Sequence, residues 1–149
     1  MSDAAIRIFT IGFAGKSAAE FFGLLGQAQV RRVIDVRLYN RSQLAGYTKQ
    51  RDLEFFLRSI LGAAYTHMPD FAPTKGLLDG YKNGSISWPQ YEAEYQALLA
   101  RRQPHRRLTP TELDRCCLLC AEKTAGRCHR RLAAEYLQRV WPGISIAHV

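Results

Sequence analysis

Two short motifs near the C-terminus hold the residue types best suited to chemistry. Cys120-Ala-Glu122 and Cys128-His-Arg130 bring two thiols, a carboxylate, an imidazole and a guanidinium close together in the chain. Cys120 and Cys128 are candidate nucleophiles, and a helix start near Cys128 would lower the pKa of that thiol. Glu122 and His129 are candidate acids or bases, and Arg130 could bind an anion. A purely structural interpretation also stays open, in which Cys120 packs at a strand end and Glu122 pairs with an arginine to brace the turn.

These motifs need a strand end and a helix start to hold them in one place. Cys116 to Cys120 is an apolar run typical of a buried strand, and residues 128–140 have the periodicity of a helix. Elsewhere, short β-like runs alternate with longer helical patterns, which is typical of a largely parallel sheet. The sequence therefore predicts one α/β domain over residues 1–149, in three layers, with a mostly parallel central sheet of about five strands flanked by helices.

The remaining elements are predicted from alternation and from helix-capping patterns. Four further strands are expected, at residues 6–11, 33–36, 64–67 and 144–149. Helices are expected to begin after the capping residues Ser17, Ser87 and Thr109, and glutamates three positions after Ser17 and Thr109 complete capping-box patterns. A helix is also expected over residues 52–61. Residues 101–107 are predicted to form a basic connector that could be mobile.

A parallel sheet gathers functional groups in the loops at the carboxyl ends of its strands. The segments expected at that edge are residues 12–17, 35–43, 65–75 and 120–130. Asp35 and Arg37 lie two positions apart, on one side of an extended segment. They could pair with each other, or they could bind substrate. Arg41, Ser42 and Gln43 add polar groups in the loop that follows.

Tyr65 and His67 form a second pair on one side of a strand, near its end. His67 is a candidate acid, base or ligand, although a lone histidine is more often a hydrogen-bonded structural residue. Tyr65, His67 and the following Lys75 are included among the candidate substrate-binding residues. Trp88 and Tyr91 could line the same cleft, or they could belong to the core.

The cysteine motifs also resemble a known family. A strand that ends in Leu-Cys-Ala-Glu, followed by a loop and by Cys-His-Arg at a helix start, is similar to the family described as domain of unknown function 488. The resemblance continues in order over nearly the whole chain, through Thr10-Ile-Gly12, Asp35-Val-Arg37, Tyr65-x-His67 and the stretch from Leu77 to Tyr91. It implies a compact α/β fold with an active-site-like pocket, and it assigns no reaction.

Two loop motifs match known nucleotide and sulfur chemistry only in part. Gly12-Phe-Ala-Gly-Lys-Ser17 has two residues where a phosphate-binding loop needs four, so a nucleotide hydrolase is not expected. A looser anion-binding turn at the helix start stays open. Asp35-Val-Arg37 resembles the second strand of rhodanese-type sulfurtransferases, but the loop from Cys120 to Arg127 is too long for that group.

A zinc site is the main alternative for the cysteines. Cys117-x-x-Cys120 together with Cys128-His129 offers four soft ligands. However, Cys117 and Cys120 are expected to point to opposite sides of a strand, which argues against a closed structural site. No metal ligand is therefore assigned, and binding of a metal or haem through one Cys or His stays open.

Composition bounds the partners and the compartment. The net charge of +8 comes from sixteen arginines and five lysines, and arginine suits bidentate contact with phosphate or carboxylate. The expected partner is an anionic small molecule or a nucleic acid, unless the basic surface serves only solubility. Clustered cysteines, with neither a secretory signal nor a long apolar segment, indicate a reduced cytoplasmic location and no membrane partner. Neither a cofactor nor an oligomeric state can be assigned.

The sequence supports three functional hypotheses. The leading one is an enzyme that acts on an anionic, phosphate-bearing substrate, with a cysteine as the nucleophile. In that enzyme Arg37 and Arg130 hold the anion, and Glu122 or His129 moves protons. The alternatives are a nucleic-acid-binding module with an arginine-rich surface, and a metal- or haem-binding protein with a sensing role.

Overall fold

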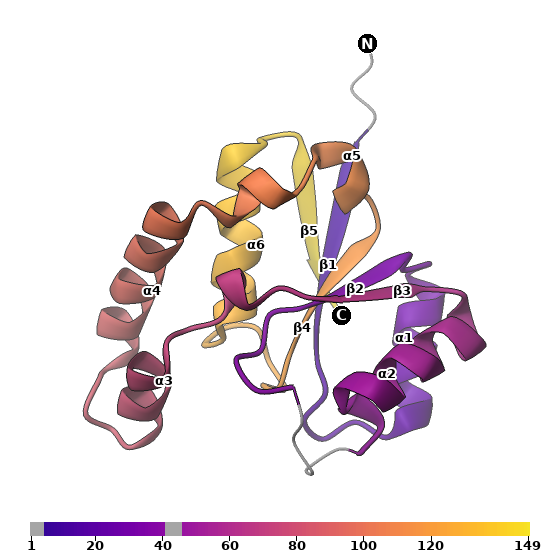
Figure 1. Ribbon diagram of the computed structural model, residues 1–149, viewed down its shortest axis with the longest axis horizontal. Helices are drawn as coiled ribbons and strands as arrows, with labels where there is room; N and C mark the ends of the chain where they lie inside the picture. Colours follow the sequence, from indigo (N-terminus) through magenta and orange to yellow (C-terminus); the bar gives the residue numbers. More distant parts are fainter. Residues whose placement is uncertain (1–4, 41–45) are drawn as a thin grey trace.

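In the computed structural model, which describes residues 5–40 and 46–149, five parallel strands form the central layer (Figure 1). Their order in the sheet is β3-β2-β4-β1-β5, and all four pairings between the described strands are parallel. The strands are β1 Ile6–Gly12, β2 Arg32–Asp35, β3 Ala64–His67, β4 Cys116–Cys120 and β5 Ile144–His148. The predicted α/β fold with a mostly parallel sheet is confirmed.

Helices cover both faces of this sheet and complete the three layers (Figure 1). One face carries α1 Ala18–Gln27 and α2 Gln50–Phe56. The opposite face carries α3 Lys75–Lys82, α4 Trp88–Arg102, α5 Pro110–Leu113 and α6 His129–Val140. Short 3-10 turns occur at Gly46–Thr48, Pro69–Phe71 and Pro104–Arg107. Within the described ranges, no helix combines the length and the apolar character that crossing a bilayer requires.

The central strand β4 packs against both helical layers. Cys116, Leu118 and Cys120 belong to the core formed with α4 and α6, whereas Cys117 and Leu119 belong to the core formed with α1 and α2. All five residues are buried, which explains the continuous apolar run, because a strand covered on both faces has no polar side. The expected opposite orientation of Cys117 and Cys120 is confirmed.

The chain leaves the adjacent strands β1 and β4 toward opposite faces of the sheet. From β1 it enters α1, and from β4 it enters α6, which covers the other face. In parallel α/β sheets, such a divergence opens a crevice at the carboxyl ends of the strands, where ligands bind. Hydrogen bonds from Phe13 N to Cys120 O (3.2 Å) and from Ala14 N to Ala121 O (2.9 Å) hold the two loops together at their base. The loop that carries the cysteine motifs therefore begins where the topology favours a site.

Local capping patterns are confirmed at three helix starts. Ser17 and Thr109 each form a capping box with the glutamate three positions on. Ser87 caps α4 through the backbone N–H of Gln90. These hydrogen bonds satisfy backbone donors that a helix start would otherwise leave unpaired.

Two stretches differ from their predicted form. The helix expected over residues 52–61 begins at Gln50, becomes a π-helix at Leu57–Leu61 and ends at Gly62 with a φ of 65°. Glycine adopts this φ without strain, so the helix can stop there. The basic connector expected at 101–107 is the end of α4 followed by a 3-10 turn. The predicted polar residues Arg41, Ser42 and Gln43 lie outside the described residues.

Candidate functional site

A cavity of about 460 Å³ opens among the loops that follow β1, β2 and β4. Five of the residues predicted for the site line it, namely Arg37, Cys120, Glu122, Cys128 and His129. They come from two distant parts of the chain, which the parallel sheet places at one edge. The cavity therefore lies at the crevice that the strand order creates.

Much of the cavity wall is aromatic. Trp88 and Tyr91 of α4 stack with ring centroids 5.2 Å apart and planes at 18°, and Tyr81 of α3 lies 5.2 Å from Tyr91. Phe13, directly after β1, lines the cavity as well. Trp88 and Tyr91 were considered from the sequence, whereas Phe13 and Tyr81 were not. Phe13 could have been found from its place after a strand end, and Tyr81 from its place within the stretch that resembles the family.

Three exposed charged side chains also line the cavity: Lys82, Glu122 and Arg127. Because the cations are exposed, they can draw an anionic ligand toward the cavity from solvent. Lys82 and Arg127 were not among the predicted site residues. Arg127 could have been identified as a site residue from its position between the two cysteine motifs.

Cys120 and His129 form a close pair on the cavity wall. The Cys120 Sγ lies 3.6 Å from Nδ1 of His129, and His129 Nε2 lies 2.7 Å from the carbonyl oxygen of Val36. A carbonyl oxygen only accepts hydrogen bonds, so Nε2 carries a proton and donates it. In the neutral ring, Nδ1 then has a lone pair, and the sulfur lies close to the ring, 3.6 Å from Nδ1 and 3.8 Å from Nε2. His129 can therefore take the thiol proton of Cys120.

The surroundings of the two neighbouring sulfurs separate their pKa values. A hydrogen bond donated by the Cys128 thiol lowers the pKa of Cys120, against the opposing effect of burial. Backbone N–H groups of Ala121 and Glu122 lower it further, as does the charge of Arg130. The pKa of Cys128 is raised, first because its thiol donates to Cys120 and then because it is buried. The sequence interpretation favoured an acidic Cys128, but the pKa of Cys120 is the lower one, because its sulfur accepts from the Cys128 thiol and from the two backbone donors.

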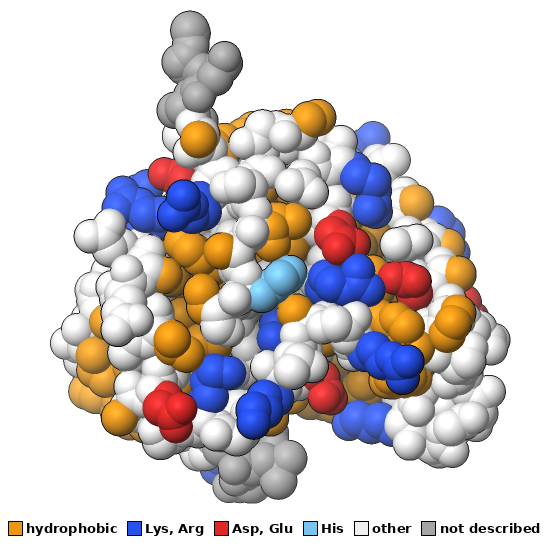
Figure 2. All heavy atoms as spheres, turned by 180° about the vertical axis from the view of Figure 1, so that it is seen from behind, with side chains coloured by type: hydrophobic (Ala, Val, Ile, Leu, Met, Phe, Trp, Pro, Cys, Tyr) orange, Lys and Arg blue, Asp and Glu red, His pale blue; other side chains and the backbone are white. Residues whose placement is uncertain are grey.

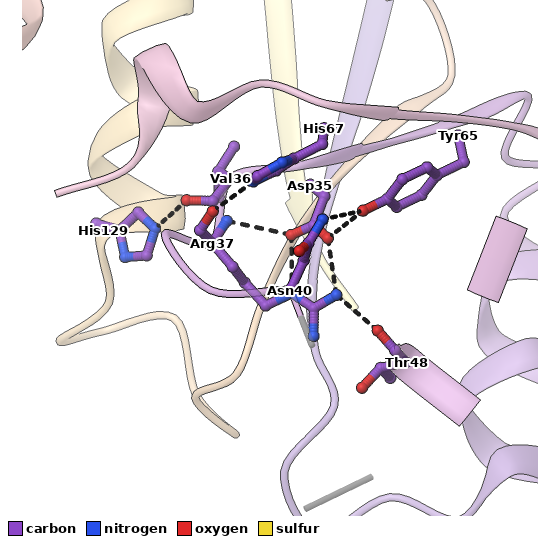
Figure 3. Close-up of polar contacts among 8 residues, drawn as sticks. All are labelled: Asp35, Val36, Arg37, Asn40, Thr48, Tyr65, His67 and His129. Atoms are coloured by element: carbon purple, nitrogen blue, oxygen red, sulfur yellow. Dashed lines mark hydrogen bonds and ion pairs between the residues drawn. The ribbon is translucent and has the colours of Figure 1, made fainter. Parts of the chain in front are cut away.

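Asp35 lies at the centre of a buried hydrogen-bond network (Figure 3). Its carboxylate accepts from Arg37 Nε at 2.8 Å, from Arg37 Nη2 at 2.7 Å and from the Tyr65 hydroxyl at 2.6 Å. Arg37 Nη2 also donates to the Thr48 carbonyl at 2.7 Å. Asp35 and Tyr65 do not line the cavity, so their place in the site is to position the Arg37 guanidinium.

The Arg37 guanidinium keeps one nitrogen uncommitted. Its side chain is 5% exposed, yet within the described residues Nη1 has no hydrogen-bond partner. The guanidinium lies over the Phe13 ring, 5.4 Å from its centroid, and both residues line the cavity. A buried donor without a partner is costly, and an anion in the cavity would supply the missing acceptor.

Arg130 is buried and holds the loop that follows β4. It donates to Thr10 Oγ1 at 3.2 Å, to the Glu122 carbonyl and to the Lys123 carbonyl at 3.5 Å, and its Nη1 lies 3.6 Å from the Cys128 sulfur. Arg130 is 1% exposed and does not line the cavity. Its position therefore suits bracing of the loop and stabilisation of negative charge on the sulfurs.

The structure places His67 and Lys75 away from this cavity. His67 Nε2 is 2.8 Å from the Arg37 carbonyl, and its ring lines a separate cavity of about 250 Å³ beside β2 and β3. Lys75, at the start of α3, is exposed and forms an ion pair with Asp79 at 2.6 Å. Of the predicted substrate-binding residues, only Arg37 lines the cavity that Cys120 and His129 share.

Three soft donor groups converge on the cavity. Among the described residues, the side chains of Cys120, Cys128 and His129 place their donor atoms within 4.8 Å of one another. Thiolate and imidazole are the ligands that zinc prefers in proteins. Cys117, the fourth ligand considered from the sequence, lies in the core on the other face of β4.

Three tyrosines near the site provide a pH test of the structure. Burial raises the pKa of Tyr65, Tyr91 and Tyr95 above the ordinary value. The unfolded phenols ionise near pH 10, so the stability that the neutral rings contribute is complete below about pH 10 and is lost as the pH rises beyond it. We expect three of the seven tyrosines to ionise only as the chain unfolds. An alkaline titration of tyrosinate absorbance, with and without urea, measures this, and complete ionisation near pH 10 in the folded protein would contradict it.

Comparison with known proteins supports the resemblance seen in the motifs. The model of the family described as Domain of unknown function DUF488 matches residues 17–137. No curated protein and no solved structure gives a significant match. The matched range includes Arg37, the aromatic wall formed by α3 and α4, and the Cys120–His129 pair. Because this match covers most of the chain, the protein is a member of the DUF488 family.

Proposed function

We propose that this protein is an enzyme in which Cys120 acts as a nucleophile on a small anionic, phosphate-bearing substrate. The observation that carries the proposal is the 3.6 Å contact between Cys120 Sγ and His129 Nδ1 on the wall of the cavity. Covalent catalysis generally places a nucleophile beside a base that a third group orients. The Val36 carbonyl is that third group, since it fixes the proton of His129 on Nε2.

The reaction proceeds in two steps. His129 takes the thiol proton, and the Cys120 sulfur forms a bond to the electrophilic centre of the substrate. The bond to the leaving group breaks, and the leaving group departs with its electron pair and receives the proton from His129. Water then cleaves the covalent intermediate, giving its hydroxyl to the substrate and a proton to Cys120. Glu122, an exposed carboxylate that lines the cavity, is placed to assist this second step.

The charges and the shape of the cavity support an anionic substrate. Arg37 offers a buried N–H group without a partner among the described residues, and Lys82 and Arg127 add exposed cations. The aromatic wall suits an apolar or flat portion of the same molecule. Arg130 acts by holding the loop after β4, because it is buried against backbone carbonyls.

Alkylation of metal-free protein, kept in a chelator, tests the nucleophile directly. At neutral pH we expect Cys120 to be modified at least about 10-fold faster than Cys116, because burial raises the pKa of Cys116 to about 11. Iodoacetate should be favoured over neutral iodoacetamide at Cys120, and added salt should reduce this preference by screening the cations. The site and rate of modification are read by peptide mass spectrometry.

Two variants give this experiment its controls. Replacement His129→Gln is expected to slow the modification of Cys120 by roughly 100-fold, the scale of a lost general base. Replacement Cys116→Ser, at the opposite end of β4, should leave the rate at Cys120 unchanged. Equal rates at Cys120 and Cys116 in the folded wild-type protein would rule the nucleophile out.

Nucleic-acid binding has weaker support than an enzyme. On the face seen in Figure 2, Lys and Arg side chains lie in several separate groups among apolar and acidic ones. A nucleic-acid surface usually gathers its cations in one patch or stripe.

We propose a cytoplasmic location for the enzyme, since all four cysteines are free and the chemistry needs a reduced thiol.

A further inference from the structure

The end of β4 and the start of α6 arrange three donor groups as a metal site would. Cys120 is the last residue of the strand, Cys128 occupies the N-cap position of the helix, and His129 is the first residue of that helix. Their donor atoms lie within 4.8 Å of one another, and Cys120 Sγ lies 3.6 Å from His129 Nδ1. In a tetrahedral zinc site, bond lengths of about 2.3 Å to sulfur and about 2.0 Å to nitrogen place such donors roughly 3.6 Å apart. Little movement is needed for the three groups to bind one ion.

The contacts around the three groups also suit a metal. A histidine that binds a metal almost always donates its other ring N–H to a carbonyl or carboxylate, and His129 donates Nε2–H to Val36 O at 2.7 Å. Arg130 Nη1 lies 3.6 Å from the Cys128 sulfur, so it can stabilise a thiolate ligand. These partners leave Nδ1 of His129 free to bind an ion beside the two sulfurs.

All three side chains line the cavity described above, at the carboxyl ends of the strands. A metal ion held by them therefore has its fourth coordination position directed toward the cavity, where a water molecule or ligand can enter. Three protein ligands with one open position differ from a closed structural site, which takes four protein ligands. Cys117 cannot supply the fourth, because its side chain is buried on the other face of β4.

We propose that Cys120, Cys128 and His129 bind one Zn²⁺ ion, or a similarly soft divalent ion, and that this ion controls the reactivity of Cys120. The inference rests on the proposed function in one respect, since the bound ion occupies the sulfur that acts as nucleophile. While the ion is bound, the lone pairs of Cys120 and His129 are coordinated to it, so Cys120 cannot attack a substrate. Loss of the ion restores the reactivity of Cys120.

Cobalt titration of the metal-free full chain tests the site, because tetrahedral Co²⁺–thiolate centres absorb in the near ultraviolet and the visible. We expect one equivalent of Co²⁺ to produce these bands and one equivalent of Zn²⁺ to abolish them. Bound Zn²⁺ should also protect Cys120 from iodoacetamide. Bands that do not appear, or that need a large excess of Co²⁺, would overturn the proposed site.

The variant Cys128→Ser separates a specific site from adventitious binding. Serine is favoured at a helix N-cap, and Cys128 makes no side-chain capping hydrogen bond, so the fold should be kept, as circular dichroism can verify. Affinity for Co²⁺ should fall by at least about 100-fold, since even the loss of an outer partner costs roughly 10–100-fold. His129→Gln should weaken binding similarly, and Cys116→Ser should leave it unchanged. Bands that persist in both Cys128→Ser and His129→Gln would place the metal elsewhere and refute the site.

The failures of the two proposals can be told apart. Rapid alkylation of Cys120 in metal-free protein, with no cobalt spectrum, removes the metal site and leaves the nucleophile. A cobalt spectrum that depends on Cys128, together with slow alkylation of Cys120 in metal-free protein, keeps the metal site and removes the nucleophile and its regulation.

Discussion

Replacing Asp35 by alanine is expected to lower the free energy of unfolding by about 3–5 kcal/mol, the cost of breaking a buried ion pair by removing one partner. Asp35 is fully buried, and it accepts both hydrogen bonds of a bidentate contact with Arg37. The replacement leaves the Arg37 cation buried with no counter-charge at this contact. It also removes the acceptor of the Tyr65 hydroxyl. The loss is therefore larger than that of an ordinary hydrogen bond.

Urea unfolding followed by circular dichroism measures this change. The matched control is Asp79→Ala, which breaks the ion pair with Lys75 on the exposed side of α3. Exposed ion pairs contribute little because solvent screens them, so this variant should unfold close to the wild type. If Asp35→Ala and Asp79→Ala unfolded at the same urea concentration, the network around Asp35 would not have the structural role assigned to it.

The same replacement should also affect the site. Arg37 is held by Asp35 and by the Thr48 carbonyl, and its remaining nitrogen has no partner within the described residues. A guanidinium freed from Asp35 is no longer fixed against Phe13 on the cavity wall. Where Asp35→Ala still folds, the preference of Cys120 for iodoacetate over iodoacetamide should therefore diminish. This readout reports the positioning of a cation and does not depend on stability alone.

The strands and helix starts could be predicted because their signals are local. The apolar run at Cys116–Cys120 and the capping boxes at Ser17 and Thr109 depend on residues within a few positions of one another. The edge of the sheet that carries the site also follows from local patterns, because alternating strands and helices favour a parallel sheet. For these reasons the sequence was sufficient to identify both cysteine motifs and Arg37 as neighbours of one cavity.

The contacts that give these residues their chemistry depend on distant parts of the chain. His129 is oriented by the carbonyl of Val36, 93 positions away, and this contact exists only because β2 pairs with β4. Which cysteine is the more acidic depends first on the hydrogen bond from the Cys128 thiol to Cys120, and then on the backbone donors of Ala121 and Glu122. A motif records residue types and spacing, and it does not record such orientations. The same limit applies to Lys75, whose segment was expected at the site but whose side chain is exposed and paired with Asp79.

Gly12→Ala is expected to damage the site more than a methyl group added at any other glycine. Gly12 lies opposite Cys120 at the end of the β1–β4 pairing. A Cβ atom there would lie 1.5 Å from the Glu122 carbonyl oxygen and 2.6 Å from Arg130 Nη1. The obstacle is backbone, so the loop after β4 has to shift. Overpacking of this kind typically costs about 1–3 kcal/mol and sometimes more, and we expect the upper end because the Arg130 contacts are lost as well.

The matched control adds the same methyl group where there is room. Gly23 is an exposed residue within α1, and a Cβ there would meet no atom within 4 Å. Because alanine favours a helix over glycine, Gly23→Ala should stabilise the protein by about 0.5–1 kcal/mol. Urea unfolding of the two variants should therefore give changes of opposite sign. If Gly12→Ala unfolded at the same urea concentration as the wild type, or at a higher one, the close approach of β1 to the Glu122 carbonyl would be contradicted.

Gly12→Ala should also change reactivity in a way that a general loss of stability would not. The Glu122 backbone that has to move carries one of the N–H groups that lower the pKa of Cys120. In variant protein that remains folded, the alkylation rate of Cys120 at neutral pH should therefore fall, while that of Cys116, at the far end of the same strand, should stay unchanged. A matched fall at both cysteines would point to a global change. A fall at Cys120 alone would show that the small residue at the end of β1 allows the loop after β4 to hold its donors against the sulfur.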